Sequence, residues 1–266
     1  MYILKKDNTI KTVYLSESMM WRFISYQSYN PYVKNGLNDV GLTYAKKSKK
    51  GLIWLSGWNV DTVNVGYGQC IRDVVDIEEA SRRGVVLVRR QGGGGAVFLE
   101  KDAEVSLSIV APQDKLPSTH KKMYEIVTSY IIEALDLVGI SSLYEPVNDV
   151  VTKTGKKISG GTLKKREGVV YIGATLLYSV DLEKMFSVLQ PDKDKYKEKG
   201  YDDVKERVTS VKDQNASVSL HDVSTALTNT IHNNFQIEES VWKPREIELA
   251  KRKAKEYKKE SWIFKR

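Results

Sequence analysis

Four consecutive glycines, Gly92 to Gly95, follow an apolar segment and the arginines Arg89 and Arg90. A glycine run loses much backbone entropy on folding, so it favours a loop that ends the preceding strand. Such a loop lets the backbone approach a ligand and point its N–H groups at it, and nearby guanidinium groups supply charge for phosphate or carboxylate recognition. No Lys-Ser/Thr pair closes the run as in a P-loop, and no helix follows it immediately. It predicts an anion-binding loop, with a flexible hairpin turn as the alternative.

The composition is that of a globular protein, with 41% hydrophobic and 29% charged residues among 266. No apolar run approaches the roughly 20 residues of a membrane span, and the first residues do not form a signal peptide. We therefore expect a cytoplasmic protein that does not contact a membrane. The single cysteine, Cys70, excludes an internal disulfide framework and a thiolate zinc site. It could still be a nucleophile, although a small buried thiol is the commoner role.

The positive charge is concentrated at one end of the chain. The formal net charge is +8, and residues 241–266 carry ten Lys or Arg against four Glu. We expect a basic C-terminal helix and tail at about 241–266, with a solvated face or a face that docks a protein partner. No stacking-aromatic motif accompanies these charges, so we expect no nucleic-acid partner.

Apolar residues at helical spacing predict five helices. The clearest runs from Lys121 to Val138 and stops at Gly139. Ser219 and Asp222 have the spacing of a capping box at the start of a second helix. The other three are expected after Ser16, where Met19, Met20, Phe23 and Ile24 would share a face, after Asp181, and from about Pro244 to Lys259.

Strand patterns fall between these helices. Alternation from Ala103 to Ala111 predicts a strand with one wet face, and the turn Thr154-Gly155 lies where a hairpin would turn. We expect an α/β (α+β) fold with mixed, mostly antiparallel sheets flanked by helices. Without repeats or linkers, residues 1–266 form one domain, in which Pro191 to Gly200 is a solvated loop. The remaining predicted strands are Leu52 to Leu55, Val63 to Tyr67, Val85 to Val88, Val147 to Val151, Lys156 to Ser159, and Val169 to Tyr178.

A second concentration of chemistry pairs Asn148-Asp149 with Lys157, which lies between Gly155 and Gly160. A lysine at a strand edge can bridge a carboxylate and a phosphate during acyl activation, because its ammonium is a compact charge with three donors. The Asn-Asp pair could hold this lysine or a hydrated magnesium ion. The alternative is a solvated basic turn. That is what we expect for Lys156, Lys164 and Lys165.

Taken together, the motifs resemble the lipoate-protein ligase catalytic domain of the biotin/lipoate ligase superfamily. The family pattern reads R-R-x-x-G-G-G-A-V, then N-D, then G-[KR]-K-[IV]-x-G. This chain has these at Arg89 to Val97, Asn148-Asp149 and Gly155 to Gly160. The resemblance covers roughly residues 50–211 and implies a class II synthetase-like catalytic fold. Further matching segments are Val63 to Gln69, Gly173 to Leu177 with Asp181-Leu182, and Arg207-Val208.

The resemblance implies a two-step ligation. Lipoate attacks the α-phosphate of ATP to give lipoyl-AMP, which then acylates a lysine of a lipoyl carrier domain. The implied cofactors are ATP and Mg²⁺, with lipoate as substrate. The implied partners are lipoyl carriers such as the E2 component of 2-oxoacid dehydrogenases or the glycine cleavage H protein.

The resemblance also assigns roles to residues. Lys157 would be catalytic, Asp149 would help to position Mg²⁺, and Arg89 would be structural. The strands Val63 to Tyr67 and Ala174 to Leu177 would supply an apolar slot for the lipoate tail. The residues implied to bind ATP and lipoyl-AMP are Arg90, Gly92, Gly93, Gly94, Gly95, Ala96, Val97, Phe98, Asn148, Asp149, Lys157, Gly160, Gly173, Ala174 and Thr175.

Ligation of lipoate has three alternatives: octanoyl transfer, biotin ligation and lipoyl binding without catalysis. An octanoyltransferase would use a cysteine just upstream of the G-K-K element and no ATP, but this chain has Asn148-Asp149 there. A biotin ligase would show G-R-G-R-x-G and K-W-P-N-D, of which only N-D is present. A non-catalytic lipoyl-binding module is the third, because the histidines lie outside the motifs.

The family's accessory C-terminal domain follows a Trp-rich segment similar to Glu260 to Phe264, and this sequence stops at Arg266. We therefore expect the accessory domain to be absent and a separate small ligase subunit to be needed for adenylation. The aromatic residues of the tail would be exposed and would dock that subunit.

Overall fold

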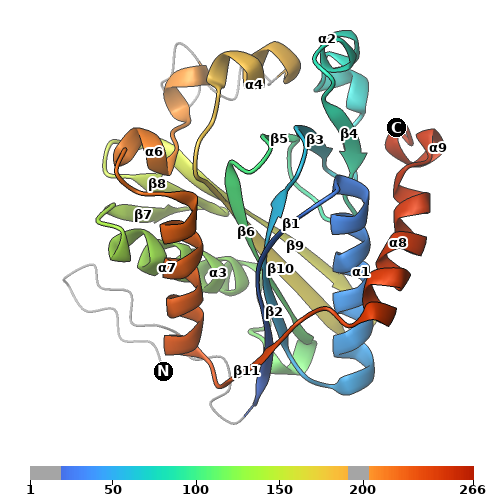
Figure 1. Cartoon of the computed structure of the whole chain (residues 1–266), viewed down its shortest axis with the longest axis vertical. Helices are drawn as coiled ribbons and strands as arrows, with labels where there is room; N and C mark the ends of the chain where they lie inside the picture. Colours follow the sequence, from blue (N-terminus) through green and yellow to red (C-terminus); the bar gives the residue numbers. More distant parts are fainter. Residues whose placement is uncertain (1–18, 191–203) are drawn as a thin grey trace.

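The computed structural model describes residues 19–190 and 204–266. They form an eight-stranded sheet with helices on both faces, and a separate three-stranded sheet (Figure 1). The strands are β1 Trp21–Tyr29, β2 Leu52–Trp58, β3 Thr62–Val65, β4 Val86–Arg89, β5 Val97–Leu99, β6 Glu104–Pro112, β7 Ser142–Glu145, β8 Asp149–Thr152, β9 Lys157–Arg166, β10 Val169–Leu177 and β11 Ile237–Ser240. The helices are α1 Pro31–Ser48, α2 Ile77–Arg82, α3 His120–Leu137, α4 Leu182–Val188, α6 Val211–Gln214, α7 Leu220–Asn234, α8 Pro244–Tyr257 and α9 Glu260–Ile263, with 3-10 turns η1 Ile71–Asp73, η2 Gln113–Lys115 and η3 Val204–Arg207.

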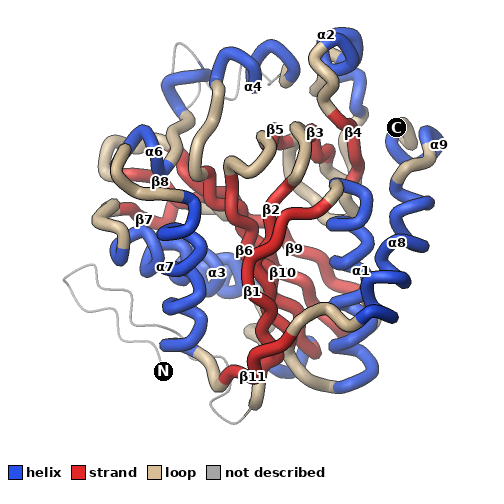
Figure 2. The backbone as a smooth tube through the Cα atoms, viewed as in Figure 1, coloured by secondary structure: helices blue, strands red, loops and turns tan. Residues whose placement is uncertain are grey.

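The large sheet has the strand order β11-β1-β2-β6-β10-β9-β8-β7. Strand β1 pairs in parallel with β2 and β11, and every other neighbouring pair in this sheet is antiparallel. The small sheet has the order β4-β3-β5. The tube in Figure 2 shows the large sheet crossing the middle of the molecule between two groups of helices. The predicted fold class is confirmed.

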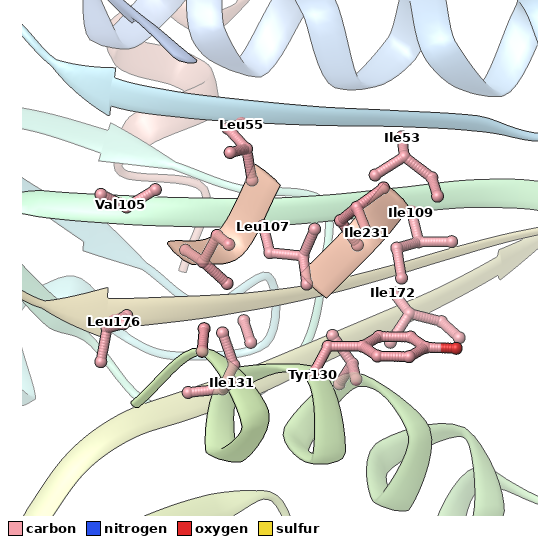
Figure 3. Close-up of a cluster of buried hydrophobic side chains, with 14 of the residues drawn as sticks. Ile53, Leu55, Val105, Leu107, Ile109, Tyr130, Ile131, Ile172, Leu176 and Ile231 are labelled. Atoms are coloured by element: carbon pink, nitrogen blue, oxygen red, sulfur yellow. The ribbon is translucent and has the colours of Figure 1, made fainter. Parts of the chain in front are cut away.

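Helices α3 and α7 cover one face of the large sheet and enclose the main core. The core side chains come from alternate positions of β2, β6 and β10 and from the apolar faces of both helices (Figure 3). Thr119 caps the N-terminus of α3, and Ser219 with Asp222 forms the predicted capping box of α7. A fully buried Leu or Ile contributes roughly 1.5–3 kcal/mol by leaving water, so this layer provides much of the apolar stabilisation.

Helix α1 covers the opposite face of the sheet, and α8 packs on α1. Helix α1 was not among the predicted elements, although Asn30 and Pro31 form a standard start: the Asn30 side chain accepts from the Tyr32 amide, and proline occupies the first turn. Its sequence holds two glycines, which are poor helix formers. One of them, Gly36, is where α8 crosses, because a Cβ there would lie 2.4 Å from the Ala250 carbonyl oxygen. Close packing therefore outweighs helix propensity in α1.

The helix predicted after Ser16 is wrong. Trp21–Tyr29 is strand β1, and Ser16 itself lies outside the described residues. The first four residues of β1 are buried on both faces, so apolar side chains do not alternate there. That pattern mimics the spacing of a helical face, and only pairing with β2 and β11 resolves it.

Strand β6 has no wet face, contrary to the prediction. Its polar positions Glu104, Ser106 and Ser108 are buried together with the apolar ones, because α1 and neighbouring elements cover that side. The other predicted strands and helices are present with small shifts at their ends, except that the strand predicted to end at Ser159 continues to Arg166 as β9. The predicted loop Pro191 to Gly200 lies outside the described residues.

The C-terminal segment also differs from its prediction. Helix α8 exposes a basic face as expected, burying Ala250 and Tyr257. The tail aromatics are not free: Trp262 and Phe264 are partly buried against the protein's own small sheet and the loop that precedes η1. Among the described residues, no helix combines the length and apolarity needed to cross a bilayer.

Candidate active site

A pocket of about 340 Å³ lies between α1, the glycine-rich loop, and the polar face of the large sheet. Most of the predicted site residues meet here although they come from distant parts of the chain. Gly93, Asp149, Gly173 and Ala174 are not part of the lining. The predicted residues that do line the pocket are Arg90, Gly92, Gly94, Gly95, Ala96, Val97, Phe98, Asn148, Lys157, Gly160 and Thr175.

Lys157 is held at the start of β9 by an acidic neighbour on β8. Its Nζ lies 2.6 Å from Oδ1 of Asp149, and the other carboxylate oxygen is 3.1 Å from Nη2 of Arg207. The Lys157 side chain is 32% exposed, whereas that of Asp149 is 10% exposed. The Thr209 amide donates to the Lys157 carbonyl, which fixes the segment that carries Arg207 beside β9. One carboxylate thus orients two cations at the edge of the pocket.

The same geometry bears on the predicted magnesium role of Asp149. Both of its oxygens are already engaged by cations. Within residues 19–190 and 204–266, no group of three or more His, Cys, Asp or Glu side chains could hold a metal ion. In this arrangement Asp149 holds Lys157 and Arg207, and its role toward magnesium stays a prediction.

Arg90 organises the glycine-rich loop by binding its carbonyl groups. The guanidinium donates to the carbonyl oxygens of Gly93 and Gly95, at 2.8 and 2.7 Å from Nη2, and to that of Asn64 at 2.7 Å. A trans peptide turns each following amide the opposite way, so the Gly94 and Ala96 N–H groups point away from Arg90. These amides donate to no acceptor in the described part of the chain. The loop therefore offers free donors to an anion.

Two details support that geometry. Gly94 has φ +93°, a conformation that only glycine adopts without strain, and Arg90 Nη2 would lie 3.0 Å from any Cβ placed there. Burial lowers the pKa of Arg90 to about 10, so the guanidinium stays charged at neutral pH. The prediction that Arg89 is structural agrees with its burial and its bonds to five backbone carbonyls.

The inner wall contains a polar network that the sequence did not indicate. Tyr257 donates from Oη to Asp39 at 2.8 Å and accepts from Gln91 Nε2 at 2.7 Å. Lys164 donates to Gln91 Oε1 and lies 3.8 Å from Asp39. Burial raises the pKa of Tyr257, and the Asp39 charge adds to this shift. Lys164 is therefore part of the pocket and not of a solvated turn.

A fully buried ion pair closes another part of the wall. Lys34 Nζ donates to Glu104 Oε1 at 3.0 Å, to Ser106 Oγ at 3.0 Å and to the Ser56 carbonyl at 3.3 Å. The ammonium also lies 4.2 Å from the centre of the Trp58 ring. Burial lowers the pKa of Lys34 and raises that of Glu104, while their contact opposes both shifts.

The apolar part of the pocket differs from the predicted slot. Val63, Val65 and Ala174 are buried in separate cores and do not line it. Alternation along β10 puts Thr175 and Leu177 in the pocket and Ala174 and Leu176 in the main core. The remaining apolar lining comes chiefly from Leu42, Trp58, Phe98, Leu99, Met185, Phe186 and Leu189.

The single cysteine lies apart from this chemistry. Cys70 is partly exposed, not buried as expected, and it precedes the η1 turn. It is not a lining residue of the pocket.

Comparison with known proteins places these features in a family context. Residues 30–232 match the family model described as the lipoyl protein ligase A/B catalytic domain. The octanoyltransferase LipM of Staphylococcus epidermidis is 22% identical over 93% of this chain and 99% of its own length.

Two solved structures have the same fold. A chain from the bi-partite lipoate protein ligase of Thermoplasma acidophilum, described with its E2 lipoyl domain, has a TM-score of 0.78 and 24% identity, covering 92% of this chain and 96% of that one. A lipoate-protein ligase A bound with ATP has a TM-score of 0.77 and 23% identity, covering 92% and 99%. Because the family model spans most of the sequence, this chain belongs to the lipoyl protein ligase A/B catalytic domain family.

Proposed function

We propose that this protein activates lipoate with ATP as lipoyl-AMP, with release of pyrophosphate, and transfers the lipoyl group to a lysine of a lipoyl carrier domain. The observation that carries the proposal is the Lys157–Asp149–Arg207 arrangement beside a loop with free amides, all at one pocket. Cations and amide donors suit a phosphate and a developing oxyanion, and the apolar lining suits an acyl chain. The fold neighbour bound with ATP is consistent with a nucleotide in such a pocket.

In this scheme the chain's own residues bind and orient the reacting groups. The Gly94 and Ala96 amides hold phosphate oxygens, with Asn148, Gly160 and Thr175 bounding the adenylate. Lys157 stabilises negative charge on the acyl carbonyl and the phosphate. In the transfer step the neutral amine of the carrier lysine attacks the acyl carbon, its N–C bond forms as the C–O bond to phosphate breaks, AMP leaves, and the amine loses a proton. When bound, Mg²⁺ would neutralise phosphate charge.

The position of Cys70 favours this proposal over a cysteine-based octanoyl transfer. Covalent acyl transfer needs a thiol within reach of the acyl carbon, and the only cysteine of the sequence is not a lining residue of the pocket. Asn148 and Asp149 occupy the region where a transferase would carry its nucleophile, and both are committed to local contacts: Asn148 Nδ2 donates to the Gly161 carbonyl, and Asp149 pairs with Lys157.

The test is a mass measurement of a lipoyl domain after incubation with this protein. Supplied lipoyl-AMP should add one lipoyl group, as should lipoate, ATP and Mg²⁺ in the presence of a candidate accessory subunit, and the Cys70→Ser variant should do both at the wild-type rate. The parallel reaction omits ATP and supplies an octanoylated carrier as donor. Transfer in that reaction, lost in Cys70→Ser, would make the protein a transferase like its LipM relative and would overturn the proposal.

We also propose that adenylation requires a second polypeptide, as the bi-partite organisation of one structural neighbour suggests. Alone, this chain should form lipoyl-AMP slowly but transfer lipoyl from supplied lipoyl-AMP, because the acyl group is then already activated. Since Trp262 and Phe264 are packed on this chain, the partner would bind elsewhere. Fast ligation from free lipoate and ATP by the purified chain would contradict this part.

A further inference from the structure

We propose that the C-terminal latch, residues 257–265, positions the glycine-rich loop and so sets the affinity for the acyl-adenylate. The inference deepens the proposed function and rests on it, because the loop is where the adenylate phosphate would bind. The latch lies far from the loop in sequence, yet it contacts the residues on either side of Arg90. Figure 1 shows α8 and α9 along one side of the molecule, with α9 beside β4, whose last residue is Arg89.

The first contact is with Arg89, which is fully buried. Its Nε lies 3.0 Å from the Ile263 carbonyl and 3.2 Å from that of Trp262. In return, Trp262 Nε1 donates to the Arg89 carbonyl at 2.9 Å. These bonds run in both directions between the end of β4 and α9. A shift of the latch would therefore move the residue that precedes Arg90.

The second contact is with Gln91, on the other side of Arg90. Tyr257 accepts from Gln91 Nε2 at 2.7 Å and is itself held by Asp39 of α1 at 2.8 Å. The Tyr257 and Trp262 rings meet edge to face with centroids 5.9 Å apart. The two contacts are therefore made by one packed unit, and not by independent side chains.

The third contact fixes residues 66–69, against which the glycine-rich loop packs. Arg89 Nη1 donates to the carbonyls of Gly66 and Gln69 at 2.9 and 2.7 Å, and Lys265 donates to Tyr67 Oη at 2.7 Å. Backbone bonds then join this segment to the loop: the Tyr67 amide donates to the Gly92 carbonyl at 3.0 Å, and the Arg90 amide to the Val65 carbonyl at 3.0 Å.

These contacts make Tyr257 and Trp262 positioning residues. With residues 89 and 91 fixed, the backbone direction of Arg90 is fixed, and its guanidinium can hold the Gly93 and Gly95 carbonyls. The free Gly94 and Ala96 amides are thereby aimed before a ligand arrives. Pre-organised donors bind more tightly because less freedom is lost on binding.

The test uses the full chain with Tyr257→Phe and Trp262→Phe combined, and each single variant. Both changes keep an aromatic ring; one removes the hydroxyl that accepts from Gln91, and the other removes the indole N–H that donates to the Arg89 carbonyl. Because the variants lose hydrogen bonds that fix the loop, lipoyl-AMP affinity measured by calorimetry should fall roughly tenfold or more. Trp262→Phe alone, whose side chain does not line the pocket, should change turnover at saturating lipoyl-AMP less than twofold. Hydrogen exchange at the Tyr67 and Arg90 amides should speed up without ligand.

The matched control is Tyr130→Phe with Trp21→Phe. These buried side chains undergo the same chemical changes, but their hydroxyl and indole nitrogen have no hydrogen-bond partner in the described residues. The control should leave exchange at Tyr67 and Arg90, and lipoyl-AMP affinity, near wild type. Unchanged hydrogen exchange in the latch variants, or an equal loss of lipoyl-AMP affinity in the control, would overturn the proposal that the latch positions the loop. Failure of the wild type to bind lipoyl-AMP would overturn the proposed function, whereas the exchange result would still decide whether the latch holds the loop.

Discussion

Two lysine–carboxylate pairs border the same pocket, and they differ in burial. Lys34 and Glu104 have side chains only 5% and 1% exposed, with 3.0 Å between Nζ and Oε1. Lys157 and Asp149 are 32% and 10% exposed, with 2.6 Å between Nζ and Oδ1. Each pair joins an ammonium to a carboxylate, so the difference in surroundings must separate their roles.

The surroundings differ in how many ammonium donors are already used. Lys34 places its donors on Glu104, Ser106 and the Ser56 carbonyl, which leaves none for a ligand. Lys157 has Asp149 as its one ion-pair partner among the described residues, and it faces the open part of the pocket. A saturated buried lysine stabilises the wall, and a partly satisfied one can act on a substrate. The predictions below test that division.

The largest effect is expected for Lys34→Met, which leaves the Glu104 carboxylate buried without its cation. Removing one partner of a buried pair costs about 3–5 kcal/mol of unfolding free energy. Denaturant unfolding of the purified variant measures this loss. The double variant Lys34→Met/Glu104→Met serves as control and should recover most of the stability, because two apolar side chains replace the pair. A single variant as stable as wild type would show that the pair does not hold the wall.

Lys157→Ala should have little effect on stability and a large one on chemistry. Loss of one charge-stabilising donor lowers turnover by about 10²–10³-fold. The measurement is lipoyl transfer from supplied lipoyl-AMP to a carrier domain, followed by mass. Lys156→Ala is the matched control, since this neighbour is not a lining residue of the pocket. Equal losses in both variants, or none in Lys157→Ala, would show that the assignment of the catalytic lysine is wrong.

The contrast between the two pairs also marks what the sequence could predict. Lys157 was identifiable because Gly155, Gly160 and Asn148-Asp149 surround it in a recognisable order. Nothing in the sequence joined Lys34 to Glu104, because they lie 70 residues apart and α1 was not predicted. Most strands and helices followed from hydrophobic periodicity. Strand β1 did not, since burial on both faces removes the alternation that marks a strand.

The polar network of the inner pocket wall could not be predicted from the sequence for the same reason. Tyr257, Asp39, Gln91 and Lys164 come from four separate elements, and only the tertiary packing brings them together. A sequence motif identifies residues that lie close together along the chain. Long-range contacts such as the latch leave no local pattern, so the sequence indicated the loop but not what holds it.

Asp149→Asn tests the more exposed of the two lysine–carboxylate pairs. The amide keeps the shape of the carboxylate but removes the charge shared by Lys157 and Arg207. Loss of a charged hydrogen-bond partner is worth about 1.5–3 kcal/mol, so lipoyl transfer should fall roughly 10- to 100-fold. The fold should persist, because Asp149 borders the pocket. Wild-type turnover in this variant would show that Lys157 does not depend on Asp149 for its position.

The smallest effect is expected for Gly95→Val, which asks whether Lys157 and the glycine-rich loop act on one ligand. A Cβ at Gly95 would meet no atom within 4 Å, and its φ is not in the left-handed region, so the unliganded loop should tolerate the change. A branched side chain there would still stand between the backbone and a phosphate. Lipoyl-AMP affinity should therefore fall about tenfold, or about 1.4 kcal/mol, while unfolding stability changes little.

The matched control is Gly68→Val, because Gly68 is equally open yet does not line the pocket. Gly94→Val is less informative, since φ +93° would strain the loop itself. If Gly95→Val and Gly68→Val bound lipoyl-AMP equally well, the loop would be a plain turn, and Lys157 would act on a ligand held elsewhere.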